Sequence, residues 1–91
     1  MDGGEFDAQL HLLRSAGRLI DDPRHRRELE SARFNLFAAL QQSDSSAAIE
    51  WIEALEVGFH AAKELAPDMR ASIERALTLI RRGVRNGTQK D

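Results

Sequence analysis

His60 is the residue in this chain whose type and neighbours could best support chemistry. On a helix it lies on the polar side of its segment, with Glu56 and Glu64 one turn away on either side. Glu56 and His60 could share a metal ion, but one helix alone supplies too few ligands for a metal site. The Glu-x-x-His spacing of di-metal helical bundles does not occur in the sequence. We therefore predict no metal site and no cofactor.

His60 and Lys63 together form a His-x-x-Lys spacing. This spacing resembles the phosphorylated helix of histidine phosphotransfer domains, which are four-helix bundles of about this size. The resemblance implies that His60 accepts a phosphoryl group and that Lys63 supplies the cation beside it. The sequence departs from the family pattern after Lys63, where Glu64 and Leu65 stand in place of a Gly and small residues, and Pro67 follows early. A phosphorelay role for His60 and Lys63 is therefore an alternative hypothesis.

The remaining residue types give no support to catalysis. The chain contains no cysteine, so it has no thiolate nucleophile, no disulfide and no cysteine-ligated zinc site. It has no Gly-rich phosphate loop and no recognisable arrangement of Ser, His and Asp. His11 and His25 have no partner that the sequence identifies. We predict that the protein is not an enzyme.

A basic cluster, Arg24, Arg26 and Arg27, stands directly after Pro23 at the expected start of a helix. Cations in the first turn of a helix oppose its dipole, so this cluster suggests an anionic partner, either an acidic protein surface or nucleic-acid phosphate. The plain interpretation is a solvated helix end neutralised by nearby acids. We expect that Gln at all three positions leaves the fold intact or stabilises it slightly, because it removes charge opposed to the helix dipole. The net charge of −2 argues against a nonspecific nucleic-acid binder. Nucleic-acid binding through the basic cluster is therefore kept only as a further alternative to a protein partner.

Several apolar residues fall outside the stripes that would face a core. They are Leu12 and Leu19 in the first helical segment, Phe34 in the second and Val57 in the third. Several such residues in one small domain suggest a contact surface. We predict a homodimer through the first helix, with Leu12 and Leu19 at its centre, the small residues Ala8 and Ala16 beside them, and Phe34 in the same contact.

Apolar periodicity predicts four helices, over residues 5–20, 23–41, 46–66 and 67–82. The third is central, and its stripe comprises Ala48, Ile52, Leu55, Phe59, Ala62 and Ala66. Residues 1–4 and 85–91 are predicted to be loose tails.

The boundaries of these helices follow from capping residues. Pro23 and Pro67 each suit a first helical position, and Asp22 suits the N-cap before Pro23. Asp44, Ser45 or Ser46 caps the third helix. Gly83 suits the position just past the end of the fourth helix.

The composition places the whole chain, residues 1–91, in one all-α domain. Strand-forming residues are scarce, with two Val and no Tyr among 91 residues. Short connectors favour antiparallel neighbours, so we predict an up-down-up-down four-helix bundle. The alternative is two stacked helical hairpins, similar to tetratricopeptide repeats. No apolar run approaches the ~18 residues of a membrane span, and the acidic N-terminus differs from a signal peptide. We expect a cytoplasmic protein that does not associate with membranes.

The leading functional hypothesis is a non-enzymatic protein–protein interaction or regulatory module. Its partner is another protein, with a second copy of the same chain expected to bind as well. Leu12, Leu19 and Phe34 would form the contact, and Arg24, Arg26 and Arg27 would steer association.

Overall fold

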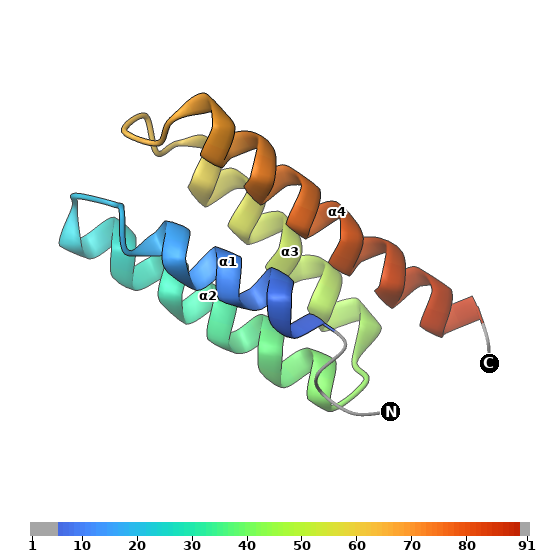
Figure 1. Ribbon diagram of the computed structural model, residues 1–91. Coiled ribbons are helices and arrows are strands. Elements are labelled where there is room, and N and C mark those ends of the chain that lie inside the picture. The colour runs from blue at the N-terminus through green and yellow to red at the C-terminus, as the bar shows by residue number, and fades with distance from the viewer. Residues whose placement is uncertain (1–5, 90–91) are drawn as a thin grey trace.

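The computed structural model describes residues 6–89, with side chains described as far as residue 86. Within this range the helices are α1 (Asp7–Gly17), α2 (Pro23–Gln41), α3 (Ser45–His60) and α4 (Pro67–Gln89) (Figure 1). Each runs antiparallel to the one before it, and α1 also packs against α4. This last contact closes one bundle, where two stacked hairpins would leave it open. The predicted all-α four-helix bundle is confirmed.

Capping residues set the start of α2 and α3. The Asp22 carboxylate accepts a hydrogen bond from the backbone N–H of Arg24 at 3.0 Å, and Pro23 occupies the first helical position. Asp44, one of the three predicted candidates, caps α3 by accepting from the N–H of Ala47 at 3.1 Å. Ser43 has a φ of 56°, which allows the tight reversal between the two helices.

The core is built from all four helices and the connectors at one end of the bundle. Its most completely buried large side chains are Leu13, Ile20, Leu36, Ile52, Leu55, Leu77 and Ile80. The predicted stripe of α3 is buried from Ala48 to Ala62, but Ala66 is exposed and Leu65 is buried in its place. The reason is that α3 ends at His60, six residues before the predicted end. Pro67 disfavours helical geometry at the residue before it, so the chain reaches α4 through a connector.

The fourth helix is longer than predicted. It continues past Gly83 to Gln89, and Val84 is buried at 8% exposure. Gly83 is therefore not a helix end. A Cβ at this position would collide with the ring of Phe6, so the missing side chain makes room for that ring. The predicted tail at 85–91 is thus helical through residue 89, while residues 90–91 and the predicted tail at 1–4 lie outside the described residues.

The first helix is shorter than predicted and ends at Gly17. The chain continues in a tight turn, in which the N–H of Leu19 donates to the carbonyl of Ala16 at 3.0 Å. This turn carries Ile20 into the core. A Cβ on Gly17 would meet nothing within 4 Å, so this glycine does not mark a close helix crossing.

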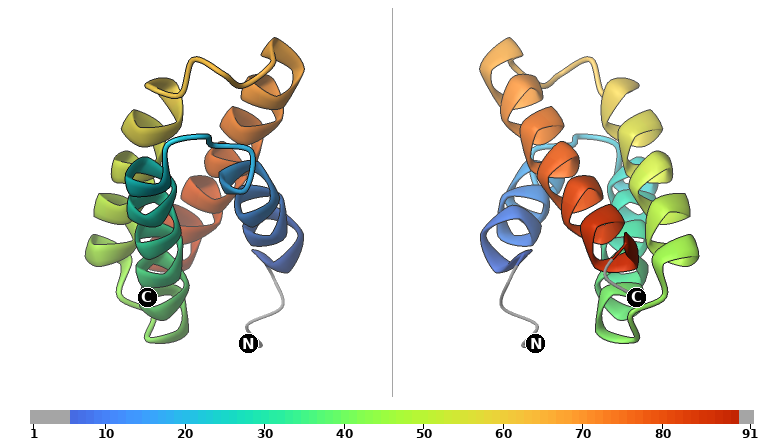
Figure 2. Two further views of the ribbon diagram at one scale, coloured as in Figure 1. Left: turned by 90° about the vertical axis from the view of Figure 1, so that its left-hand side faces the viewer. Right: turned by 90° about the vertical axis from the view of Figure 1, so that its right-hand side faces the viewer.

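The helices differ in how closely they approach one another. Figure 2 shows α2 and α3 side by side along their lengths, with α4 inclined relative to them. Gly58 allows the close α2–α3 contact, because a Cβ there would stand 2.5 Å from Leu29 Cδ2. None of the helices in residues 6–89 is long and apolar enough to cross a lipid bilayer.

Candidate functional surfaces

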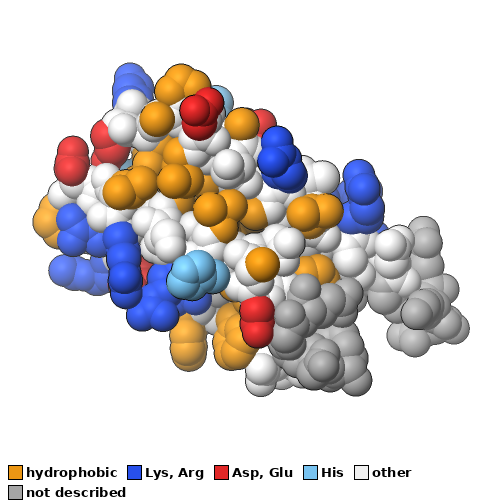
Figure 3. Space-filling view, in the orientation of Figure 1, with side chains coloured by type: hydrophobic (Ala, Val, Ile, Leu, Met, Phe, Trp, Pro, Cys, Tyr) orange, Lys and Arg blue, Asp and Glu red, His pale blue; other side chains and the backbone are white. Residues whose placement is uncertain are grey.

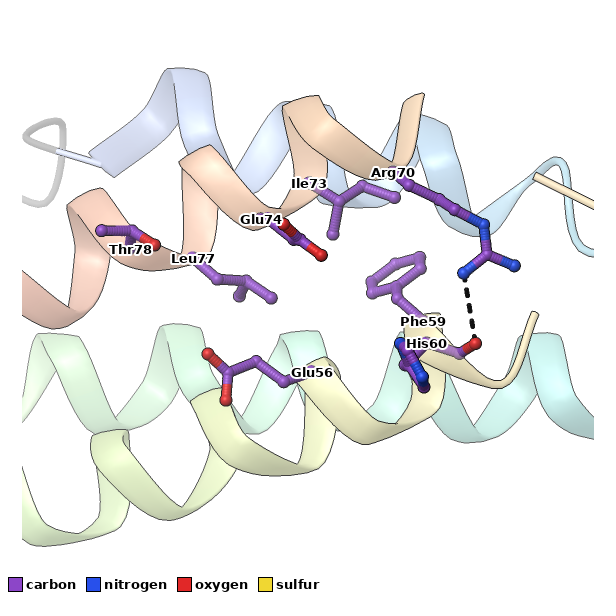
Figure 4. Close-up of a pocket in the computed structure, with 8 residues that line it drawn as sticks. All are labelled: Glu56, Phe59, His60, Arg70, Ile73, Glu74, Leu77 and Thr78. Atoms are coloured by element: carbon purple, nitrogen blue, oxygen red, sulfur yellow. Dashed lines mark hydrogen bonds between the residues drawn. The ribbon is translucent and has the colours of Figure 1, made fainter. Parts of the chain in front are cut away.

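His60, the last residue of α3, stands at the edge of a groove of about 290 Å³ between α3 and α4 (Figure 4). The buried side chains of Phe59, Ile73 and Leu77 form its apolar floor, and Figure 4 shows the Phe59 ring pointing toward α4. The polar side chains around the floor are Glu56, His60, Arg70, Glu74 and Thr78. The groove is thus open and of mixed charge.

The arrangement around His60 differs from that of a phosphotransfer helix. Because α3 ends at His60, Lys63 lies in the connector and not one helical turn further along the same helix. Glu56 and Glu74 line the same groove and would repel a phosphoryl group. Glu56 is also held in an ion pair with Arg81 at 3.0 Å. The phosphorelay hypothesis therefore stays an alternative that the geometry does not favour.

Arg70 joins the start of α4 to the end of α3. Its guanidinium donates to the carbonyl of His60 at 3.2 Å, to that of Leu65 at 3.4 Å and to that of Ala62. Figure 4 shows the side chain reaching across to His60. These carbonyls belong to the last turn of α3 and the connector after it, where helical partners are missing. Arg70 therefore acts as a cap supplied by a neighbouring helix.

A second link joins the two connectors at this end of the bundle. The backbone N–H of Asp21 donates to Glu64 Oε2 at 2.9 Å. This hydrogen bond lowers the pKa of the Glu64 carboxyl below its ordinary value, because it stabilises the charged form. The α1–α2 connector is thereby attached to the α3–α4 connector.

The three arginines of the basic cluster differ in whether they bond to the protein itself. Arg26 bonds its own chain, with Nε donating to the Ile20 carbonyl at 2.9 Å and a second nitrogen donating to the Asp21 carbonyl at 3.4 Å. The exposed side chains of Arg24 and Arg27 make no hydrogen bond or ion pair with the described residues. Only Arg24 and Arg27 are therefore available to an anionic partner without breaking internal bonds.

His25, which interrupts the cluster, also has an internal partner that the sequence could not identify. One of its ring nitrogens, Nε2, lies 2.9 Å from the carbonyl oxygen of Gly58. This contact ties the first turn of α2 to the last turn of α3, so His25 belongs to the packing of the bundle.

Replacing Arg26 with Gln is expected to lower the free energy of unfolding by about 1 kcal/mol, because Gln cannot bond both carbonyls. Replacing Arg24 and Arg27 with Gln is expected to change it by less than about 0.5 kcal/mol, or to raise it slightly, because charge opposed to the helix dipole is removed. Urea denaturation followed by circular dichroism measures both. Equal losses in the two variants would show that Arg26 has no special role.

The exposed apolar residues lie on separate faces. Leu19 is 52% exposed and Leu12 is half-buried. Arg14 and Gly17 line a shallow groove toward α2, which places Leu12 on the other flank of α1, toward α4. Phe34, 63% exposed, lies on α2 and not on the helix that carries Leu12. Ala16 is fully buried, so the expectation that it flanks a contact is wrong.

A second groove, of about 620 Å³, runs along the outer side of the α2–α3 pair. The residues that line it are His25, Glu28, Leu29, Ala32, Glu50, Trp51, Glu53, Ala54, Val57 and Gly58. The charged side chains in this set are all glutamates, so we call it the acidic groove. The sequence indicated the misplaced Val57, but not the groove. Its shape depends on how closely α2 and α3 approach.

The described residues contain no group of three or more His, Asp or Glu side chains that could hold a metal ion. A comparison of the chain with family models, with curated proteins and with solved structures finds no match. Functional interpretation therefore depends on the surfaces themselves.

Proposed function

We propose that this protein is a non-enzymatic protein–protein interaction module that forms a homodimer through α1. The observation that carries the proposal is the apolar face along α1 and its seam with α4. Figure 3 shows hydrophobic side chains running in a band between these two helices. Single exposed apolar residues are common, but a continuous apolar band on a small domain is typical of a contact surface.

The face on α1 has a regular spacing. Ala8, Leu12 and Ser15 follow one another on α1 at steps of four and three residues, Leu19 follows in the turn after α1, and none of them is charged. Such a stripe can pack against an identical stripe around a two-fold axis. In an antiparallel pairing, Leu12 of one copy would lie near Leu19 of the other. The small, exposed Ala8 would let the two helices approach.

A second copy of the chain is the occupant that this stripe favours, because its lack of charge gives no reason to select a charged partner. Arg24 and Arg27, exposed at the start of α2, would then be free to steer a further, acidic protein partner. The absence of cysteine supports a cytoplasmic location as part of this proposal.

Replacing both Leu12 and Leu19 with Glu is expected to convert the dimer into a folded monomer, because four like charges would meet at the two-fold contact. Sedimentation velocity and light scattering at micromolar concentrations and high salt measure the mass, and circular dichroism measures the fold. Phe34→Glu is the matched control, since Phe34 is as exposed as Leu19 but lies on another face. The control is expected to stay dimeric.

Two results would contradict the proposal. One is a monomeric wild-type protein at high micromolar concentration. The other is unfolding of the Leu12→Glu, Leu19→Glu variant instead of dissociation, which would place both leucines in the monomer core.

A further inference from the structure

We propose a second, head-to-tail contact, in which the acidic groove of one copy binds the outer face of α4 of another copy. This outer face consists of Arg75, Leu79 and Arg82, and we call it the α4 ridge. The contact goes beyond the homodimer through α1, because it uses different helices and joins unlike surfaces.

The acidic groove combines apolar and negatively charged side chains. Val57 is 72% exposed, and Trp51 is half-buried in the same lining. The exposed carboxylates of Glu28, Glu50 and Glu53 line the same groove. Among the described residues, no Lys or Arg lines the groove. Its preferred occupant therefore combines an apolar side chain with flanking cations.

The groove is also well defined in shape. Its lining includes Leu29 and Gly58, where α2 and α3 pack so closely that a Cβ on Gly58 would displace the end of the Leu29 side chain. The hydrogen bond between His25 and the Gly58 carbonyl joins α2 and α3 at the same place. A preformed site of this kind loses little conformational entropy on binding.

The α4 ridge offers the complementary pattern. Arg75, Leu79 and Arg82 follow at steps of four and three residues and so lie along one line of the helix. Leu79 is 41% exposed, and the two arginines are exposed without a hydrogen bond or ion pair to the described residues. Figure 3 shows basic side chains standing along the edge of the molecule that α4 forms.

The two surfaces also agree in length. Arg75 and Arg82 are seven residues apart on α4, and the α3 residues that line the groove run from Glu50 to Gly58. Seven residues of helix correspond to about 10 Å. The ridge can therefore lie along the groove, with Leu79 on its apolar side chains and the two arginines within reach of its glutamates.

One molecule cannot satisfy its own groove, because the ridge lies on α4 and the groove on the outer side of α2 and α3. Each copy thus presents one groove and one ridge. A contact between unlike surfaces is heterologous and continues from copy to copy unless it closes into a ring. We expect assemblies larger than a dimer at low salt, and their dissociation as salt rises.

Charge reversal tests this pairing directly. Glu50→Lys with Glu53→Lys changes the groove, and Arg75→Glu with Arg82→Glu changes the ridge. Each pair is expected to weaken head-to-tail association on the order of tenfold or more, because like charges then face each other. The variant with all four changes restores opposite charges and is expected to recover association close to the wild-type level. Sedimentation velocity at low salt, over a range of protein concentrations, measures each.

The matched control is Glu30→Lys with Glu74→Lys, which makes the same change in net charge outside both surfaces. It is expected to associate like the wild type. Running the series also with Leu12→Glu and Leu19→Glu in place separates this contact from the α1 homodimer. If those two changes unfold the chain, the charge-reversal series is measured with Leu12 and Leu19 intact. In that case assemblies larger than a dimer report the head-to-tail contact.

Three results would overturn the pairing. The four-change variant could stay as weak as either pair. The control could weaken as much as the groove variant. The wild-type protein could form nothing larger than a dimer at low salt and high micromolar concentration. Loss of the α1 homodimer alone would leave the head-to-tail contact standing.

Discussion

Replacing Leu55 with Ala is expected to lower the free energy of unfolding by about 3 kcal/mol. Leu55 lies at the middle of α3 with no exposed surface, and α3 packs against both α2 and α4. Removing its branched end discards apolar contacts and leaves a cavity that helices on both sides cannot fill. A domain of this size has on the order of 5–10 kcal/mol of stability, so the loss is a large fraction of the total.

The measurement is urea denaturation of the wild type and of Leu55→Ala, with Phe59→Ala as a second core change expected to cost about 3–5 kcal/mol. Val57→Ala is the control on the same helix. Because Val57 is 72% exposed, its truncation is expected to change stability by less than about 0.5 kcal/mol. Losses below about 1 kcal/mol at both core positions would mean that another face of α3 is buried.

Replacing Arg70 with Ala is expected to lower the free energy of unfolding by about 2 kcal/mol, because three backbone carbonyls lose a charged donor. Arg70→Lys is expected to recover only part of this loss, since an ammonium group lacks the planar fork that reaches several carbonyls at once. Hydrogen exchange should show faster opening of the last turn of α3 in the Ala variant.

Arg75→Ala provides the control for Arg70. It makes the same residue change on the same helix, but Arg75 is exposed and bonds none of the described residues. Its stability is expected to stay within about 0.5 kcal/mol of the wild type. If both variants lose stability equally, the effect belongs to α4 in general and not to the cap on α3.

Local signals in the sequence were sufficient for the start of the helices and for most of the core. Asp22 and Pro23 fixed the start of α2, because both act within one turn. The spacing of Ile52, Leu55 and Phe59 identified the buried face of α3, because burial on a helix follows its period. These features depend on neighbouring residues only.

The ends of helices were harder to predict, because contacts from distant residues decide them. Gly83 has the appearance of a helix end, yet α4 passes through it, and the absence of a side chain there leaves room for the Phe6 ring. The end of α3 is bonded by Arg70, which belongs to the next helix. The sequence shows both residues but not which distant atoms they meet.

The sequence was sufficient to identify which apolar residues are exposed, but not the shape of the surfaces that they form. The exposure of Leu19, Phe34 and Val57 followed from their positions outside the apolar stripes. Their distribution over different faces, and the acidic groove around Val57, depend on how α2 and α3 cross at Gly58. The internal bonds of Arg26 are likewise a consequence of where the α1–α2 connector lies.

The contact between Phe6 and Gly83 also bears on how the chain folds as it is synthesised. It joins residues near opposite ends of the sequence, whereas α2 and α3 are consecutive and meet through a three-residue connector. On the ribosome, the α2–α3 hairpin can form and α1 can pack against α2 while α4 is still being translated, but α1 has no surface on α4 to cover until α4 has emerged. The apolar side chains of α1 that pack on α4 are therefore the ones that stay uncovered longest, and during that interval they are open to chaperones or to other nascent chains.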